Sequence, residues 1–222
     1  MKKVLVELQY FPSIYWFALF FYADKVVIDD VEPFRKQTFR NRAQIQTANK
    51  VFSLIVPVHK GKSKHPVTQV TIDFSEDWRR LQWRAIESAY KNAAFFDFYK
   101  DDLRDLFTYK EPYLADLSLI ILDRLQSLLS FSFKEKLLFR SIEQGKNGLE
   151  YDEDWRGAIR PKKNAFKAEQ TFSIVPYPQV FGERFGFRPG LSIIDLLFNT
   201  GPEAEEILRK MVPNKGHQEE VS

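Results

Sequence analysis

The chain of 222 residues contains no cysteine. This excludes disulfide bonds, thiolate nucleophiles and metal sites built on cysteine. Only three histidines are present, and the spacing of His59, His65 and His217 does not match a zinc site. A G-x-S-x-G nucleophile elbow is also missing. We therefore assign no metal ligand and do not expect a thiol enzyme, a zinc enzyme or a serine hydrolase.

Glycine is sparse, with nine residues, and the first turn after a predicted strand, LQYFPS, contains none. A dinucleotide-binding fingerprint and a P-loop both need glycines at this turn, so the chain has neither. The cofactor therefore stays unknown.

Long uncharged runs are absent, and none reaches the roughly 18 residues needed for a membrane span. The basic, apolar start is interrupted by Glu7 and Gln9, broken by Pro12, and followed by no cleavage site. We expect no signal peptide, no membrane span and a cytoplasmic protein.

The chain also lacks a strong excess of charge of either sign, because its net charge is only +3 and acids alternate with bases. No nucleic-acid partner is expected from the chain as a whole. The hydrophobic content of 44% and the 21 phenylalanines are sufficient for a packed core. We predict one α/β domain over residues 1–212 and a disordered tail over 213–222.

The first thirty residues predict a βαβ unit. Residues 3–8 and 25–28 have the apolar composition of buried strands, and Ser13 is a suitable N-cap for a helix over 14–22. Two strands joined through a helix run parallel. Ligands of such sheets bind beyond the carboxyl ends of the strands. Those ends carry Tyr10, Asp29 and Asp30.

Further strands are predicted at 39–45 and 51–58, forming a hairpin within a mixed sheet, and at 67–74. The helical second half is expected to pack against this sheet. Its helices are predicted over 75–93, with Ser75 as cap, and over 95–107, 113–129, 191–199 and 202–211. Residues 134–172 are predicted to form an irregular loop with short strands, and residues 172–175 are predicted to form a last strand.

The segment between Asp29 and Val58 combines acids with bases and predicts a site for an anionic, hydroxyl-bearing ligand. In a strand, Arg40 and Arg42 would share one face and grip a phosphate or carboxylate, while Asn41 would face the other side. A solvated strand face paired with Glu32 or Asp30 is the alternative. Asp29 and Asp30 suit a general base, hydroxyl binding or Mg²⁺, but adjacent strand residues point apart.

Aromatic side chains of the first long helix allow two interpretations. Trp83 and Tyr90 recur at helical spacing with Ile86, which favours a core-facing stripe. Alternatively, Tyr90 followed by Phe95 and Phe96 would wall an apolar pocket for a sugar or a base, and Trp83 and Tyr90 are then candidate binding residues. Near the C-terminus, Ser192 and Asp195 have the spacing of a capping box, which is sufficient to explain them. The alternative is a catalytic serine–aspartate pair. Gly201 and Pro202 are expected to end one helix and start the next.

Together, YFP with its following aromatics, IDD, KQTFRNR, a hairpin and VPV resemble the WbqC-like proteins. The segments WRRLQWRAIESAYKNAAFFDFY and FRPGLSIIDLLFNTGPEAEEIL fit the same family. The resemblance covers most of the chain except residues 134–172. The positions that match the family motifs are Tyr10, Asp29, Asp30, Lys36, Arg40, Asn41 and Arg42. The family pattern leads us to expect histidine at Gln82, proline at Ala94 and tyrosine at Phe39, so the chain departs from it there.

The resemblance implies a bacterial protein of polysaccharide or O-antigen biosynthesis, with glycyl or acyl transfer onto an amino sugar. Our leading hypothesis is such a transferase, binding a small-molecule sugar or acyl donor. Arg40 and Arg42 would hold its anionic group, Asp29 or Asp30 would orient a hydroxyl or amine, and Asn41 would bind the transferred group.

The alternative is a non-catalytic binding or assembly protein for an anionic glycan precursor. A weaker third hypothesis is nucleic-acid binding through Lys60, Lys62, Lys64 and the arginine hairpin. The sequence does not determine the oligomeric state.

Overall fold

The chain forms a mixed α/β structure, as predicted, and the computed structural model describes residues 1–59, 65–143, 150–161 and 166–213. Four parallel strands make the main sheet in the order β5-β2-β1-β6. Their bounds are β1 (Lys3–Glu7), β2 (Lys25–Asp29), β5 (Leu137–Phe139) and β6 (Glu153–Asp154). Glu7 lies opposite Asp29 in the register of β1 and β2. The predicted βαβ unit is confirmed, and the carboxyl ends of the strands meet at one edge.

Helix α1 (Ile14–Tyr22) connects β1 to β2 and is almost wholly buried. Ser13 caps it as predicted, because the hydroxyl oxygen accepts a hydrogen bond from the Trp16 amide at 3.4 Å. The indole of Trp16 donates to the Glu7 carbonyl at 3.0 Å. This apolar helix is therefore fixed to the end of β1 by one polar contact.

The turn between β1 and α1 is held from two sides. The Tyr10 amide donates to the Phe39 carbonyl at 2.9 Å, and the Ile193 amide donates to the Pro12 carbonyl at 2.8 Å. Phe11 has a φ of 41°, a left-handed conformation that costs free energy in a residue with a side chain. These contacts to distant segments hold the turn in a shape that it would not keep alone.

The predicted hairpin forms from β3 (Arg42–Gln46) and β4 (Val51–Ile55), which pair antiparallel. It is a separate two-stranded sheet and does not join the parallel one, contrary to our expectation. Arg40 lies in the turn before β3, so the predicted shared strand face of Arg40 and Arg42 is wrong. The Arg40 side chain turns back towards Glu32 and takes no part in the ladder.

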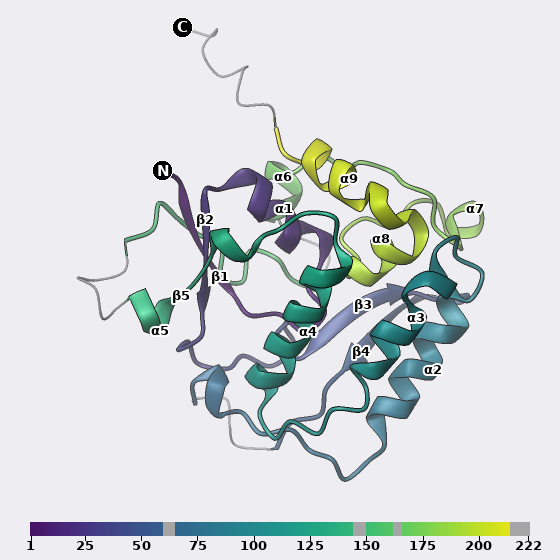
Figure 1. The fold of residues 1–222 in the computed structure, drawn as a ribbon, viewed down its shortest axis with the longest axis horizontal. Helices are drawn as coiled ribbons and strands as arrows, with labels where there is room; N and C mark the ends of the chain where they lie inside the picture. Colours follow the sequence, from purple (N-terminus) through teal and green to yellow (C-terminus); the bar gives the residue numbers. More distant parts are fainter. Residues whose placement is uncertain (60–64, 144–149, 162–165, 214–222) are drawn as a thin grey trace, which may run out of the picture.

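Helices dominate the rest of the chain. They are α2 (Trp78–Tyr90), α3 (Phe96–Asp105), α4 (Leu114–Leu128), α5 (Arg140–Glu143), α6 (Phe166–Thr171), α7 (Gly182–Phe185), α8 (Ile193–Thr200) and α9 (Ala204–Met211). Short 3₁₀ turns occur at Val67–Gln69, Lys134–Lys136 and Gly201–Glu203. In Figure 1 the hairpin lies between the parallel sheet and the pair α2–α3, while α8 and α9 pack near α1. The predicted long helices are confirmed with small shifts of their ends.

The strand predicted at 67–74 is wrong. Its main chain forms a 3₁₀ turn and then bonds to separate segments, because Ile72 donates to the Pro112 carbonyl at 2.9 Å and Val70 accepts from the Leu114 amide at 2.9 Å. The segment therefore links the hairpin to the start of α4 without a continuous partner strand.

Two further local predictions also fail. Asp77, not Ser75, caps α2, because its carboxylate accepts from the Arg80 amide at 3.4 Å. No strand forms at 172–175, where the Ser173 amide donates to the Met211 carbonyl at 2.8 Å.

The tail predicted to be disordered lies almost wholly outside the described residues, as do Lys60, Lys62 and Lys64. In the described part of the chain, no helix has the length and apolar character of a membrane span.

Candidate functional site

The carboxyl end of β2 is occupied by a charged network centred on Asp29. This side chain is fully buried. One of its carboxylate oxygens accepts from Arg140 at 2.8 Å and from Arg156 at 2.6 Å. The Arg156 guanidinium also donates three hydrogen bonds to the Asp154 carboxylate at the end of β6. Asp29 therefore ties together the segments that follow β5 and β6.

The neighbouring strand β1 ends in a second buried carboxylate, Glu7. One oxygen accepts from the Gly157 amide at 2.8 Å and the other from the Gln9 side chain at 3.2 Å. Gly157 has a φ of 71°, which favours glycine. Glu7 thereby fixes the loop after β6 against the edge of the sheet.

Asp30 points to a different partner from Asp29, as expected for adjacent strand residues. It accepts from the Ser141 amide at 2.9 Å and also from the Ser141 hydroxyl. These contacts hold the start of α5. Both acids of the IDD motif therefore have protein partners in the described structure.

Glu32 and Arg40 form a buried ion pair beside this network. Arg40 donates from Nε to one Glu32 oxygen at 2.7 Å and from Nη2 to the other at 2.6 Å. Burial raises the pKa of Glu32, and the hydrogen bonds from Arg40 oppose that rise. The remaining nitrogen, Arg40 Nη1, is buried and has no hydrogen-bond partner in the described structure.

A cavity of about 270 Å³ lies next to Arg40. Its described lining residues are Arg35, Lys36, Gln37, Thr38, Arg40, Gly157, Arg160 and Pro161. Four of these eight carry positive charge and none is acidic, so we call this cavity the cationic pocket. Gln37 has a φ of 60°, and such strained non-glycine residues often occur at binding sites. An anion is the ligand best matched to this lining.

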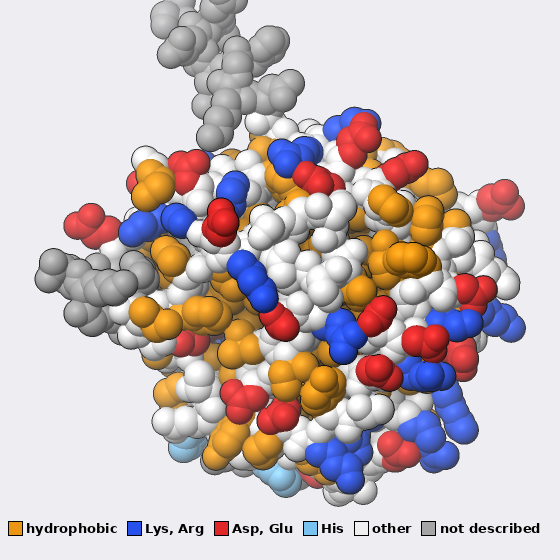
Figure 2. Space-filling model, viewed as in Figure 1, with side chains coloured by type: hydrophobic (Ala, Val, Ile, Leu, Met, Phe, Trp, Pro, Cys, Tyr) orange, Lys and Arg blue, Asp and Glu red, His pale blue; other side chains and the backbone are white. Residues whose placement is uncertain are grey.

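The positive charge of the pocket is a local feature. Figure 2 shows one face of the molecule, on which acidic and basic side chains are interspersed without separation by sign. Among the described residues, no group of three or more acidic, histidine or cysteine side chains could hold a metal ion.

Other residues predicted for the site lie in the frame around it. The Tyr10 hydroxyl donates to Gln82 at 2.9 Å, and Gln82 donates to the Ile55 carbonyl at 2.7 Å. The position where we expected a histidine therefore bridges the β1 turn and β4. Asn41 donates to the Val56 carbonyl at 2.9 Å, which fixes the base of the hairpin. Arg42 is partly buried, and this burial lowers its pKa.

The aromatic residues of α2 face protein partners. Trp83 packs against Phe96, with ring centroids 6.4 Å apart, and against Phe107. Tyr90 is buried and donates from its hydroxyl to Asp195 at 2.7 Å. Neither Trp83 nor Tyr90 is among the described lining of the cationic pocket.

The predicted capping box at the start of α8 does not form. The Ser192 hydroxyl donates to the Phe11 carbonyl at 2.9 Å, so it does not cap the helix. Asp195 accepts from Tyr90 and from Tyr177, each at 2.7 Å. Burial raises the pKa of Asp195, and the tyrosine hydrogen bonds oppose this effect. The carboxylate thus connects α8 to α2 inside the core.

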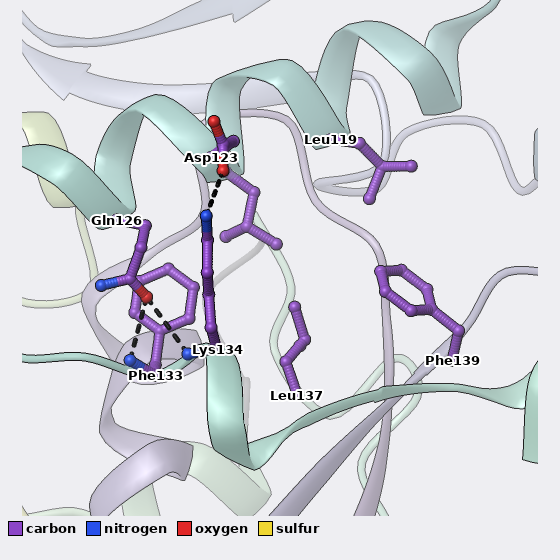
Figure 3. A pocket seen from close by; sticks show the side chains of 8 residues that line it. Leu119, Asp123, Gln126, Phe133, Lys134, Leu137 and Phe139 are labelled. Carbon is purple, nitrogen blue, oxygen red and sulfur yellow. Dashed lines mark hydrogen bonds and ion pairs between the residues drawn. The ribbon is translucent and has the colours of Figure 1, made fainter.

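A different cavity, of about 280 Å³, separates α4 from β5. Figure 3 shows Leu119, Leu137 and Phe139 on its walls and the ion pair between Asp123 and Lys134 across it. Its lining is mostly apolar, and among the described residues none of its buried side-chain nitrogen or oxygen atoms lacks a partner. We therefore assign the candidate site to the cationic pocket.

Sequence reasoning missed the residues that segment 134–172 contributes. Arg140 and Arg156 bind Asp29, while Gly157 and Arg160 line the pocket. The available signal was WRG at residues 155–157, an arginine and a glycine after a short strand at a sheet edge. It was too short to separate from an ordinary loop.

Comparisons with known proteins agree with the motifs. The chain is 30% identical over 233 residues to "Uncharacterized protein Rv1507c" of Mycobacterium tuberculosis, covering 94% of this chain and 98% of that protein. No solved structure matches the chain significantly. The family model described as "WbqC-like protein family" matches residues 9–153 and 162–207. This match includes Asp29, Asp30, the basic residues within 35–42 and helix α8. The chain therefore belongs to the WbqC-like protein family.

Proposed function

We propose that the protein is a cytoplasmic transferase of bacterial surface-polysaccharide (O-antigen) biosynthesis. It binds the anionic group of a small-molecule sugar or acyl donor in the cationic pocket. The observation that carries the proposal is this pocket at the carboxyl edge of the sheet, together with the unpartnered Nη1 of Arg40. Membership of the WbqC-like protein family supports the proposal. The group that we propose to be transferred is a glycyl or acyl unit, and its acceptor is an amino sugar.

Arg40 is prepared for an anion before any ligand arrives. Glu32 accepts from two of its nitrogens, so the guanidinium is held in one orientation and the third nitrogen stays free. Orienting a flexible arginine in advance reduces the entropy lost on binding. Arg35 and Lys36 are exposed and add charge that is able to adjust to the ligand. Arg160 is also exposed, and its Nε donates to the Gly157 carbonyl, which anchors it to the pocket wall.

The proposed transfer needs little from the protein beyond position and charge. The amine nitrogen of the acceptor bonds to the carbonyl carbon, the leaving group of the donor departs with the electron pair of the broken bond, and the amine proton passes to solvent water. Negative charge grows on the leaving group, where the cations stabilise it. Asp29 contributes by holding the loop that carries Gly157 and Arg160, through its contact with Arg156. Asp30 and Asn41 fix neighbouring segments in the same way.

The alternative, a non-catalytic protein that binds an anionic glycan precursor, is favoured by one observation. The described lining of the cationic pocket contains no carboxylate and no histidine to accept the proton from an amine. The two functions share the same binding step. They differ in whether a transferred group leaves the donor.

Binding is tested with inorganic pyrophosphate by isothermal titration calorimetry. We expect Lys36→Ala and Arg160→Ala each to weaken binding by about tenfold, because each removes a charge-assisted contact. Arg84→Ala is the matched control, since Arg84 is exposed on α2 and lies outside the described lining of the pocket. Equal affinity in all four proteins would remove the proposed site.

Catalysis is tested by following a labelled glycyl or acetyl group from an activated donor to an amino sugar phosphate. Transfer that is lost together with pyrophosphate binding in Lys36→Ala supports the transferase. Binding without transfer for every donor selects the non-catalytic alternative.

A further inference from the structure

A second cavity adjoins the cationic pocket. Its volume is about 430 Å³, and Arg160 and Pro161 line both spaces. The side-chain amide of Gln44 in β3 donates to the Pro161 carbonyl at 3.0 Å and fixes this shared wall to the hairpin. The two cavities therefore lie side by side around one short segment.

One residue that lines the second cavity has a buried hydroxyl without a hydrogen-bond partner. Tyr15 lines it and is only 4% exposed, yet its hydroxyl has no hydrogen-bond partner in the described structure. Burial raises the pKa of Tyr15 to about 12, with a further contribution from Glu169, so the hydroxyl stays protonated near neutral pH. A buried hydroxyl without a hydrogen-bond partner destabilises the folded state. Such a group suggests that a ligand completes the site.

The Tyr15 ring itself is not free to stack on a ligand. It packs against Phe172 at 6.1 Å between centroids, with the planes 15° apart. Gly190 lies against its edge, because a Cβ added there would come within 2.8 Å of Tyr15 Cε2. The ring is therefore held by protein contacts, and the hydroxyl is the polar part of Tyr15 that still lacks a partner in the described structure.

The rest of the lining combines apolar and polar groups. Phe39 and Leu191 supply apolar surface, while Gln44, Glu169 and Arg188 supply acceptors and donors. This mixture suits a ring with hydroxyl groups better than a flat base, which needs an open aromatic face.

We propose that the second cavity binds the ring of a sugar whose phosphate lies in the cationic pocket, so that the ligand is a sugar phosphate. This inference rests on the proposed anion binding and adds the class of molecule that carries the anion. Tyr15 donates its hydroxyl hydrogen to the ring, and Arg160 lies between the ring and the phosphate.

The test compares three probes by calorimetry: glycerol phosphate, glucose 1-phosphate and uridine monophosphate. Glycerol phosphate carries the phosphate without a ring. We expect wild-type protein to bind glucose 1-phosphate about tenfold more tightly than glycerol phosphate. Tyr15→Phe should remove that advantage, with a loss of about tenfold for one hydrogen bond, and leave glycerol phosphate unaffected. Tyr113→Phe, at an exposed tyrosine before α4, is the control.

The stability of Tyr15→Phe gives an independent check. Removing an unpartnered buried hydroxyl should not lower the melting temperature, so a loss of sugar phosphate binding would not reflect unfolding. Equal affinity for glycerol phosphate and glucose 1-phosphate, unchanged in Tyr15→Phe, would overturn this inference alone. Tighter, Tyr15-dependent binding of uridine monophosphate would replace the sugar with a nucleoside. Absence of binding for all three probes would overturn the proposed anion site as well.

Discussion

Arg40→Leu is expected to lower the free energy of unfolding by about 3–5 kcal/mol. The substitution leaves the carboxylate of Glu32 buried without its partner, and Glu32 is only 4% exposed. The double variant Glu32→Leu, Arg40→Leu removes both charges and should recover much of this loss. Urea unfolding monitored by circular dichroism measures all three proteins. A single variant as stable as the wild type would show that the ion pair is not structural.

The loss in Arg40→Leu should depend on pH. Burial raises the folded-state pKa of Glu32 above its usual value, and Arg40 opposes the rise, so removing Arg40 raises it further. The folded state then binds a proton more tightly than the unfolded state does. The contribution of Glu32 to the stability of the variant is therefore highest below the unfolded-state pKa of Glu32, and it is lost as the pH rises through the folded-state pKa. We expect the defect to be smaller at pH 4 than at pH 7.

This ion pair also affects how the site is tested. A loss of ligand binding in Arg40→Ala would not separate a missing contact from a misfolded turn. Lys36 and Arg160 are exposed and line the same pocket, so their substitution leaves the Glu32 pair intact. They are the better positions for a binding experiment.

Gly201→Ala is expected to cost about 3 kcal/mol. Gly201 follows α8 with a φ of 54° and a ψ of −124°, a backbone region largely restricted to glycine that costs a residue with a side chain about 1–3 kcal/mol. An added Cβ would also come within 2.5 Å of the Phe95 ring, and overpacking of this kind costs about 1–3 kcal/mol.

Gly186→Ala is the matched control for this prediction. Gly186 has a φ of 69° but nothing within 4 Å of an added Cβ, so it reports the backbone cost alone. We expect thermal unfolding to show a smaller loss for Gly186→Ala than for Gly201→Ala. Equal losses would mean that the contact with Phe95 contributes nothing.

The parts of the fold that could be predicted are those specified locally. Ser13 before an apolar run gives α1, and the short strands on either side of it give a parallel pair. Gly201 and Pro202 mark the boundary between α8 and the turn that starts α9. Each signal depends on neighbours within a few residues, so the sequence shows it directly.

The contacts of the candidate site could not be predicted in this way. Asp29 meets Arg140 and Arg156 across more than a hundred residues, through two strands of three and two residues. Such short strands form only because the sheet edge is already present, and they leave almost no pattern in the sequence. For the same reason the role of Arg160 became visible only in three dimensions.

The assignment of Arg40 failed for a related reason. The sequence predicted a strand over 39–45, but the buried Glu32 carboxylate provides a stronger partner for Arg40 than a ladder position does. Tertiary electrostatics thus overrode a local propensity, and the outcome was a preorganised guanidinium beside a cavity.

The location of bound anions in a crystal tests the central claim most directly. Crystals soaked in tungstate give strong anomalous peaks that mark anions without assumptions about the natural ligand. We predict a peak in the cationic pocket, within hydrogen-bond distance of Arg40 Nη1 and near Lys36 and Arg160. A second cluster of bases near Trp83, formed by Arg79, Arg80, Arg104 and Lys110, provides an internal comparison. Peaks at that cluster with none beside Arg40 would contradict our account of the site.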